Sequence, residues 1–413
     1  MSFAPQVSVV VASHGRPGFL ARTVTGVAQV LYPSFEVVVV ADTKGVGAVA
    51  ALPFADQIKT VVCDAANISA ARNLGIAQAA GEIIAFIDDD AVPEPTWLTQ
   101  LGAPFENPAV AAVGGFVIGR NGISLQWGAR EVDDIGQPHA LALTGDAPRI
   151  IQPTPGRAIK TEGTNCAFRR RILAELGGFD PNYRFYLDET DLNMRLAQAG
   201  YATAIAPRAL VHHGFAPSER RAADRAPRSL FDIGASSAVF ARKFASAARQ
   251  ADAMAQLAVQ QKQRAVAHMV AGRIEPGRVT FLMQSLRDGI DQGSKRPLAP
   301  LPALPAAGAE FRAFRRPGAT GQTRILAGRF WQARRLRKRA RKLAGQGDIV
   351  TLFLFSPTAL FHHHRFDEAG FWEQRGGLFG RSARSGRLFR MQRFATRVAR
   401  EARRIAQQRG HGA

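Results

Sequence analysis

Short apolar runs recur along the first part of the chain, and amphipathic stretches separate them. Such runs, rich in β-branched residues, are typical of strands covered on both faces, and the stretches between them have helical spacing. Strands that alternate with helices favour a parallel sheet, because parallel neighbours are joined by crossover helices. The pattern therefore predicts an α/β fold with a doubly wound, mainly parallel sheet. The first four strands are expected at residues 7–12, 35–41, 60–63 and 83–87.

Three consecutive carboxylates, Asp88, Asp89 and Asp90, follow the fourth predicted strand. Open α/β sheets bind ligands just outside the carboxyl ends of their strands, so these residues are a candidate active-site floor. Adjacent negative charges repel each other unless a divalent cation or a helix N-terminus neutralises them. A solvated acidic turn, favoured by Pro93 and Pro95, explains the same three residues about as well.

Three further polar residues in this part of the chain have two interpretations each. Asp42 follows the second predicted strand, where a carboxylate can bind the base or ribose of a nucleoside or can cap the next helix. Arg72 is either a phosphate ligand or a solvated helix arginine, and Asn73 is either a ligand contact or an ordinary helix residue. No Gly-x-Gly-x-x-Gly or Walker-type loop follows the first strand, which argues against a dinucleotide oxidoreductase or a P-loop enzyme.

A second acidic cluster opens a predicted helix at Asp188, Glu189 and Asp191. One interpretation is a helix N-terminus, where a cap and first-turn carboxylates are stabilised by free N–H groups and the helix dipole. The other is that one carboxylate is a general base, which takes the proton from an attacking hydroxyl group. A strand predicted at residues 201–211 follows and ends at a pair of histidines.

Several motifs, taken together and in this order, make the chain similar to glycosyltransferase family 2. They are Asp42 after its strand, Asn67-x-x-x-Ala71-Arg72-Asn73, Asp88-Asp89-Asp90, Gly163-Thr164-Asn165, Gly177-Gly178-Phe179-Asp180 and Asp188-Glu189-x-Asp191-Leu192. The resemblance covers roughly residues 7–215. It implies a GT-A fold, a nucleotide-diphosphate sugar donor, a Mg or Mn ion, and transfer with inversion at the anomeric carbon.

The resemblance also implies roles for single residues. Asp42 and Asp88 match the carboxylates near the base and ribose, and Asp90 matches the metal-binding carboxylate. A hard divalent ion prefers such oxygen ligands and bridges the two phosphates of the donor. The complete donor-binding set is Ser13, Asp42, Arg72, Asn73, Asp88, Asp89, Thr164 and Asn165, and the metal set is Asp90 with either His212 or His213.

The order of the acidic pair departs from the family pattern. Family 2 enzymes usually have Glu-Asp where this chain has Asp188-Glu189, and the general base matches the second residue of the pair. The resemblance therefore assigns the base to Glu189, with Asp188 as the alternative. Because a Glu side chain is one methylene longer, the backbone can sit slightly farther from the acceptor.

Charge is distributed unevenly along the chain. Residues 1–220 hold 17 Lys and Arg against 21 Asp and Glu, a net of −4. Residues 221–320 hold 16 against 7, a net of +9, and residues 321–413 hold 21 against 5, a net of +16. A basic region attached to an acidic domain usually engages a polyanion. We expect an anionic membrane surface rather than nucleic acid.

The composition divides the chain into four parts. We expect the GT-A domain at 1–218, a basic helical extension at 219–294, a Pro- and Gly-rich linker at 295–321, and a small basic α/β or α-rich region at 322–413. Within the extension, residues 228–244 combine Phe with Arg, which suits either an interfacial membrane helix or a helix packed on the first domain. In the last part we expect a helix at 324–343, a strand at 349–355 and a helix at 387–408.

The two cysteines, Cys63 and Cys166, have no ligand-like spacing, so we expect neither a disulfide framework nor a zinc site. The N-terminus has no secretory signal pattern, and no run of about 18 apolar residues is present. A cytoplasmic protein, peripheral at most on the inner face of the plasma membrane, fits these features. The favoured function is metal-assisted, inverting sugar transfer to a glycan or lipid-linked acceptor of the cell envelope or an exopolysaccharide. The alternatives are a nucleotidyltransferase of related fold and a non-enzymatic polyanion-binding protein.

Overall fold

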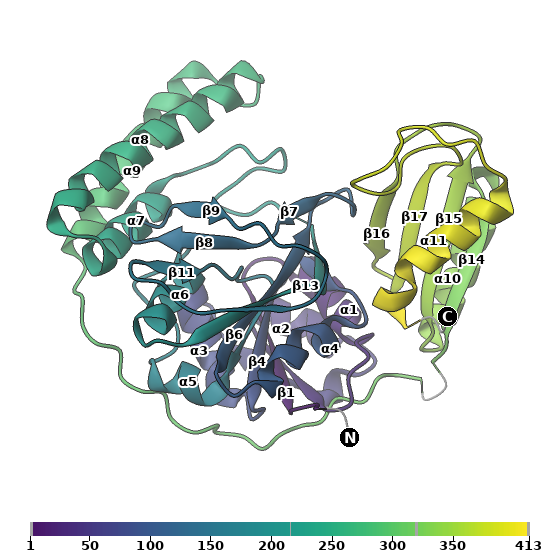
Figure 1. Ribbon diagram of the computed structural model, residues 1–413, viewed down its shortest axis with the longest axis horizontal. Coiled ribbons are helices and arrows are strands. Elements are labelled where there is room, and N and C mark those ends of the chain that lie inside the picture. The colour runs from purple at the N-terminus through teal and green to yellow at the C-terminus, as the bar shows by residue number, and fades with distance from the viewer. Residues whose placement is uncertain (1–2, 215, 319–320, 411–413) are drawn as a thin grey trace.

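The apolar runs of the sequence form the centre of a ten-stranded sheet (Figure 1). The computed structural model describes residues 3–214, 216–318 and 321–410. The strand order is β10-β13-β6-β12-β4-β1-β2-β3, with β5 paired to β13 and β7 to β6. These strands are β1 (Val7–Ser13), β2 (Phe35–Ala41), β3 (Ile58–Val62), β4 (Ile83–Asp88), β5 (Ala91–Pro93), β6 (Val110–Ile118), β7 (Leu125–Trp127), β10 (Arg149–Ile151), β12 (Cys166–Arg169) and β13 (Ala202–His213).

Strand direction confirms the predicted fold class. β4, β1, β2 and β3 are mutually parallel, and β6 and β13 are parallel to each other. β12 runs antiparallel between β4 and β6. The sheet is therefore mixed but mainly parallel, as the alternation of strands and helices predicts. The helices on its faces are α1 (Pro17–Val27), α2 (Thr43–Ala50), α3 (Ile68–Gln78), α4 (Trp97–Gly102), α5 (Arg170–Glu175) and α6 (Asp188–Gln198).

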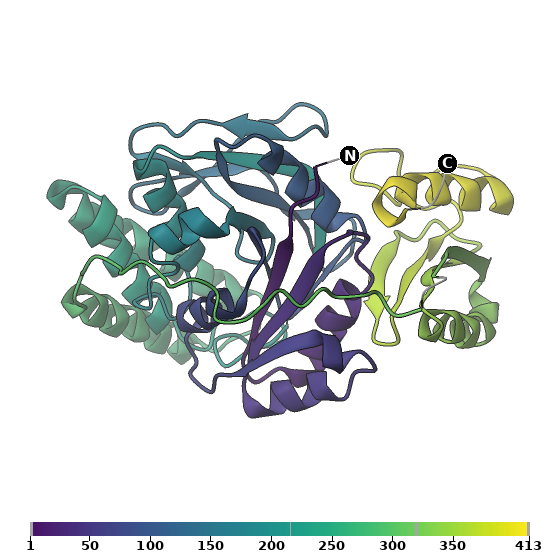
Figure 2. The same ribbon diagram turned by 90° about the horizontal axis from the view of Figure 1, so that it is seen from below.

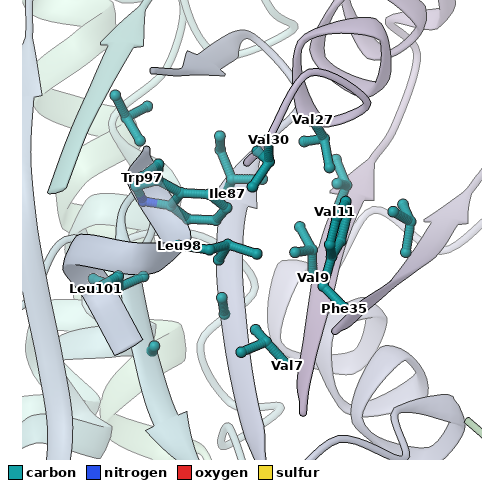
Figure 3. Packing of buried hydrophobic residues seen from close by; sticks show 14 of the residues in the cluster. Val7, Val9, Val11, Val27, Val30, Phe35, Ile87, Trp97, Leu98 and Leu101 are labelled. Atoms are coloured by element: carbon teal, nitrogen blue, oxygen red, sulfur yellow. The ribbon is translucent and has the colours of Figure 1, made fainter. Parts of the chain in front are cut away.

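The central strands are buried on both faces. One side of β1 contributes Val7, Val9 and Val11 to a core that also holds Phe35 and Trp97 (Figure 3). All seven residues of β1 and of β2 are buried. Burial on both faces explains why these strands are continuous apolar runs rather than alternating ones. The core fixes the carboxyl ends of β1 and β4, where the polar residues of interest begin.

Residues between β7 and β12 form a smaller antiparallel sheet. Its strands are β11 (Arg157–Ile159), β8 (Arg130–Asp133) and β9 (Pro138–Ala140), in that order. Between β6 and β12 the chain thus contributes strands to both sheets. Lys160, directly after β11, bonds to α6 through Glu189, as described below. This small sheet therefore contributes one wall of the cleft.

Three helices follow the first sheet: α7 (Phe231–Phe244), α8 (Ala247–Val270) and α9 (Pro276–Lys295). The backbones of α7 and α9 approach so closely at Gly289 that a Cβ atom added there would lie 2.0 Å from the carbonyl oxygen of Phe231. Phe240 is fully buried in a cluster with Tyr183 and Leu187. Of the two expectations for residues 228–244, the structure supports the helix packed on the first domain. The interfacial membrane helix is wrong at this position, since its apolar face is already covered.

Residues 297–318 contain no helix or strand and run across the underside of the first sheet and its helices (Figure 2). Phe314 enters the main core, with its ring centroid 5.3 Å from that of Phe35 and 5.6 Å from that of Phe54. The backbone N–H of Arg312 donates to the buried Glu36 carboxylate at 2.9 Å. The segment is therefore held along its course by packing and by hydrogen bonds.

The last part of the chain is a small α/β unit, in agreement with one of the two predicted classes. Its sheet has the order β14-β15-β17-β16, and α10 and α11 accompany it. Residues 324–329, predicted as helix, are a strand that pairs in parallel with β15, because long-range pairing overrides local preference. The final helix starts at residue 394 rather than 387. The elements are β14 (Thr323–Arg329), α10 (Ala333–Gly345), β15 (Ile349–Ser356), β16 (His363–Asp367), β17 (Phe371–Gly377) and α11 (Phe394–Arg409).

The C-terminal unit contacts the first sheet through the end of α11. The guanidinium of Arg409 binds the carboxylate of Glu94, which follows β5, and all of these atoms are buried. The hydroxyl of Thr96 donates to the carbonyl oxygens of Gln407 and Gln408. In the described part of the chain, no helix has both the length and the apolar character needed to cross a bilayer.

Candidate active site

A cleft of about 630 Å³ lies at the carboxyl edge of the large sheet. Its floor comes from the ends of β1 and β4, one wall from the small sheet and the start of α6, and another from the loop between β13 and α7. Among the residues that line it are Ser13, Arg16, Arg72, Asp88, Asp90, Lys160, Thr164, Asp188, Glu189, His213 and Arg221. The cleft therefore occupies the position at which open α/β sheets bind ligands.

Two carboxylates and one imidazole converge on the floor of the cleft. One ligand-type atom from each of Asp88, Asp90 and His213 lies within 4.8 Å of the others. The His213 Nε2 atom is 3.1 Å from Asp90 Oδ1. Oxygen ligands with a single imidazole suit Mn²⁺, and also Mg²⁺ when further oxygens complete the shell. The donor set therefore fits a divalent cation.

Asp90 is buried, yet its surroundings favour the ionised form. Burial alone would raise the pKa of Asp90, but His213, Arg16 and the Ala216 N–H outweigh it and hold the pKa well below its usual range. The Ala216 N–H donates to Asp90 Oδ2 at 2.7 Å, and Arg221 Nη2 lies 3.6 Å from the same oxygen. An ionised carboxylate is the form that a divalent cation binds.

His212, which the sequence offered as an equal candidate for the metal, faces the other way. Its Nε2 atom lies 2.8 Å from Glu94 Oε1, and its ring lies 4.9 Å from that of Trp372. Successive side chains of a strand point to opposite faces, so only one of two adjacent histidines on β13 can face the cleft. The assignment of His212 to the metal set is therefore wrong, and His213 is the candidate.

Asp89, between the two cleft carboxylates, is completely buried beneath them. It pairs with Arg16 Nη2 at 2.6 Å and accepts a hydrogen bond of 2.6 Å from Ser13 Oγ. Burial raises the pKa of Asp89, and the Arg16 guanidinium only partly opposes this effect. Asp89 does not line the cleft, so its assignment to donor binding is corrected: it holds Ser13 and Arg16 in place at the end of β1, and Ser13 itself lines the cleft.

Arg72 connects the two acidic clusters. From its position on α3, the buried guanidinium reaches Asp88 Oδ1 at 3.2 Å through Nη2 and binds Asp188 through Nη1. It also donates to the Gly163 carbonyl oxygen at 3.1 Å and lies over the Phe179 ring. One cation therefore fixes the spacing between the floor and the α6 wall.

A strained turn presents the α6 carboxylates to the cleft. Tyr186 and Leu187 both have left-handed backbone angles, with φ of 72° and 65°, which non-glycine residues rarely adopt. The helix starts immediately afterwards at Asp188, so Asp188 and Glu189 lie in its first turn. Strained backbone of this kind clusters at functional sites, where the surrounding structure maintains it.

Asp188 and Glu189 have different partners and opposite pKa shifts. Burial raises the pKa of Asp188, and its pair with Arg72 only partly opposes this. Burial would also raise the pKa of Glu189, but Lys160 outweighs this effect and lowers the pKa. The Lys160 Nζ atom lies 2.7 Å from Glu189 Oε1. The Glu189 side chain is 14% exposed and that of Asp188 is 6% exposed. Glu189 is thus the ionised and more accessible member of the pair.

Two further predicted donor ligands, Asn73 and Asn165, also have structural tasks instead. Asn73 donates to the Phe179 carbonyl oxygen and accepts from its N–H, so it fixes the Gly178–Phe179 turn. Asn165 is completely buried, accepts from Trp97 Nε1 at 2.8 Å and donates to the carbonyl oxygens of Phe116 and Ala209. Neither side chain lines the cleft. Their assignment to donor binding is therefore corrected: both amides bind backbone or core groups.

The remaining predicted donor residues lie at or beside the cleft. Thr164 lines it, and its buried Oγ1 has no hydrogen-bond partner among the described residues. Asp42 caps α2 through the Gly45 N–H and also accepts from the N–H of Gly15, a cleft residue. Burial of Asp42 is outweighed by these backbone hydrogen bonds, which lower its pKa. Asp42 thus combines both interpretations of its position, as helix cap and as a carboxylate next to the cleft.

Several cleft residues were not singled out from the sequence. Arg16 lies in the loop after β1, Lys160 follows β11, and Arg221 lies in the loop after β13. Arg16 belongs to a strand-end loop, which is the kind of signal that identified Asp42 and Asp88. Lys160 follows a short strand that the sequence pattern did not predict, and Arg221 lies eight residues beyond the end of β13.

Curated relatives resemble this chain over part of their length. The O-antigen biosynthesis protein RfbC of Myxococcus xanthus is 29% identical over 246 residues, which cover 54% of this chain and 18% of the relative. The glucosyl-dolichyl phosphate glucuronosyltransferase of Haloferax volcanii is 31% identical over 184 residues, covering 43% of this chain and 56% of the relative. The chain therefore matches little more than half of either protein at most.

Solved structures overlap with it more loosely. A mannosyltransferase from Pyrobaculum calidifontis, solved with GDP-Man and Mn²⁺, aligns at 18% identity and a TM-score of 0.43, over 70% of this chain and 87% of that one.

A family model matches the first part of the sequence. The family described as Glycosyltransferase like family 2 matches residues 5–230, more than half of the chain. That range contains the large sheet, both acidic clusters and the cleft between them. The chain therefore belongs to the glycosyltransferase family 2-like proteins.

Proposed function

We propose that this protein transfers a sugar from a nucleotide-diphosphate sugar to a hydroxyl acceptor, with inversion at the anomeric carbon. The observation that carries the proposal is the position of Arg72, which pairs with both Asp88 and Asp188. This arrangement sets a carboxylate of the metal-type cluster and the carboxylates of α6 on opposite sides of one cleft. A donor held at the first cluster would have its anomeric carbon directed at an acceptor near the second.

Donor binding is assigned to the floor of the cleft. Asp88, Asp90 and His213 would hold Mg²⁺ or Mn²⁺, and a bound divalent ion offsets the charge that develops on a departing diphosphate. Arg16 and Arg221 add positive charge at the same place, within 3.4 and 3.6 Å of Asp90 Oδ2. The unpartnered Thr164 hydroxyl is available to a hydroxyl group of the donor.

Acceptor activation is assigned to Glu189. The acceptor oxygen attacks the anomeric carbon while its proton passes to the Glu189 carboxylate, and the bond to the diphosphate breaks on the opposite side of the sugar. Lys160 keeps Glu189 ionised and positions it through the 2.7 Å contact. A single displacement of this kind inverts the configuration. An envelope or exopolysaccharide glycan, or a lipid-linked intermediate, is the proposed acceptor class.

A donor screen tests the proposal. UDP-, GDP- and TDP-sugars would be added to the protein with Mn²⁺ or Mg²⁺, and thermal unfolding and sugar release would be measured, because a ligand bound only by the folded state raises its stability. We expect at least one donor to raise the melting temperature only when metal is present. Asp90→Asn should abolish the response, whereas the control Asp146→Asn, at an exposed site outside the cleft, should retain it.

The same screen separates the two alternative functions. A nucleotidyltransferase would give no sugar release and would instead form pyrophosphate from a nucleoside triphosphate. A polyanion-binding protein without activity would respond to none of the nucleotides and would bind RNA or DNA with steep salt dependence. Either result would refute sugar transfer by this cleft.

A further inference from the structure

The C-terminal sheet gathers three loops at one edge. β14, β15 and β17 are parallel, and their last residues are in register, with Arg329 opposite Phe355 and Ser356 opposite Gly377. The loops that follow these strands therefore leave the sheet at the same edge, which is at the top of this unit in Figure 1. We call these segments, residues 330–331, 357–362 and 378–393, the loop edge.

The loop edge carries an unusual amount of exposed apolar surface. Trp331 is 64% exposed and Met391 is 77% exposed. Within described residues 321–410, every large apolar side chain that is exposed lies in this edge. Scattered exposed apolar residues are normal on a protein surface, but a cluster of them marks a site of interaction. The set is Phe330, Trp331, Leu360, Phe361, Leu388, Phe389 and Met391.

Backbone hydrogen bonds and a ring contact connect the loops to one another and to the end of β17. The Gly377 N–H donates to the Leu360 carbonyl oxygen at 2.9 Å, and the His362 N–H donates to the Arg381 carbonyl oxygen at 3.0 Å. Across the longest loop, the Phe389 ring lies 5.7 Å from the ring of Phe379. The exposed apolar side chains therefore belong to loops that are held together by these contacts.

Positive charge flanks the tips, and two acidic side chains that pair with these cations, Glu373 and Glu401, are buried. Residues 329–345 contain eight Lys and Arg and no Asp or Glu, and residues 378–400 contain seven Arg and no Asp or Glu. The connecting residues 357–366 also lack acidic side chains. Several of the cations are exposed next to the apolar residues, namely Arg334, Arg335, Arg384, Arg387, Arg390 and Arg393.

We propose that the loop edge docks on an anionic lipid bilayer, with its apolar tips among the headgroups and its arginines on the lipid phosphates. Aromatic and aliphatic tips beside Lys and Arg are the composition that the interface of a membrane favours. Clustered cations add attraction to an anionic leaflet within a Debye length of its surface. This site differs from the α7 segment, whose Phe240 is buried.

The position of the loop edge relates it to the cleft. The His364 N–H, one residue inside β16 from the loop edge, donates to the Asn121 carbonyl oxygen at 2.9 Å. Asn121 belongs to the loop after β6, which leaves the large sheet at the same carboxyl edge as Asp88. The loop edge therefore lies next to the edge of the large sheet that holds the cleft. A hydroxyl acceptor at the bilayer surface would be close to the cleft.

Vesicle sedimentation of the full chain tests the docking surface. We expect the protein to pellet with vesicles of phosphatidylcholine and phosphatidylglycerol at low salt, and not with phosphatidylcholine alone. The triple variant Trp331→Ser, Phe361→Ser and Leu388→Ser removes apolar tips from all three loops and should weaken binding by about tenfold or more. As a matched control, Val259→Ser with Val270→Ser removes exposed apolar side chains from α8 and should leave binding unchanged.

A fluorescence measurement tests insertion directly. Trp331 is the exposed tryptophan, since Trp97 and Trp372 are buried and Trp127 is half-buried. Brominated lipids should quench its emission, and Trp331→Phe should remove the quenching while it retains sedimentation. The proposal would be overturned if the wild type does not pellet with anionic vesicles, or if the triple serine variant pellets as well as the wild type. Binding of single-stranded RNA with no binding of vesicles would also overturn it.

Discussion

Glu94 and Arg409, separated by 315 positions in the sequence, form a completely buried two-bond ion pair, with Nε–Oε2 at 2.9 Å and Nη2–Oε1 at 3.0 Å. His212 contacts the same carboxylate, and its neighbour His213 belongs to the metal-type cluster. The junction between the C-terminal unit and the large sheet thus lies one residue away from the candidate metal site.

Removal of one partner of this pair should be costly. Arg409→Met leaves the buried Glu94 charge without its main partner, and loss of one partner from a buried pair costs about 3–5 kcal/mol. Urea unfolding would measure the loss. The control Arg171→Met breaks an exposed pair with Glu175, and such surface pairs are worth at most about 1 kcal/mol. If the two substitutions lowered the free energy of unfolding equally, the buried Glu94–Arg409 pair would contribute no more than a surface pair.

The same pair predicts a pH dependence of stability. Burial alone would raise the pKa of Glu94, but Arg409 and His212 outweigh it and lower the pKa to about 2. Because the pKa in the folded state is depressed, this contribution to stability is complete above the pKa of the unfolded chain, about 4.3. It is lost as the pH falls from there toward 2. Denaturant melts across this window should show the decline, and Glu94→Gln should flatten it in part, since Glu401 also has a pKa lowered to about 2.

The adjacent histidines offer a matched pair of substitutions for the metal site. His213→Ala removes the candidate imidazole ligand and should weaken Mn²⁺ binding by at least about tenfold in calorimetric titration, by comparison with the effect of outer-shell changes. His212→Ala should leave Mn²⁺ affinity near that of the wild type and lower stability instead, because its imidazole contacts Glu94. The reverse pattern would place the metal on the opposite face of β13.

The two α6 carboxylates can be separated by kinetics. Glu189→Gln should lower kcat by about 10²–10⁴, the usual contribution of a general base, with donor affinity preserved. Asp188→Asn takes away a partner of Arg72 and should act mainly on donor binding and stability. Steady-state kinetics with a responsive donor, together with donor titrations, would measure both. If Asp188→Asn abolished turnover while Glu189→Gln retained it, the base would be Asp188.

Sequence patterns predicted that Asp88 and Asp90 lie at the candidate site, because strand ends are visible in them. Asp88 and Asp90 follow a continuous apolar run, and the carboxyl ends of buried parallel strands share one edge, so their meeting with other strand-end groups follows from the fold class. The choice between His212 and His213 depends on which face of β13 covers the cleft. Local spacing does not contain that information, since both faces of β13 are largely buried.

Other parts of the prediction failed where side chains meet distant backbone. Asn73 and Asn165 stand inside family motifs, yet their amides bind groups up to 106 positions away. Lys160, which binds Glu189 and lowers its pKa, comes from a segment without a periodic pattern. In the C-terminal unit, residues 324–329 resemble the start of a basic helix, and only their pairing with β15 makes them a strand.

Phe314 has a consequence for how this protein can be divided. Its ring fills the space between Phe35 and Phe54, although the residue belongs to a segment whose composition resembles a free tether. A fragment cut after α9 would expose both rings to water and would deprive Glu36 of the Arg312 N–H. An excised fragment that keeps the core around Phe35 intact must therefore carry this segment past Arg315, whose N–H donates to Gln57.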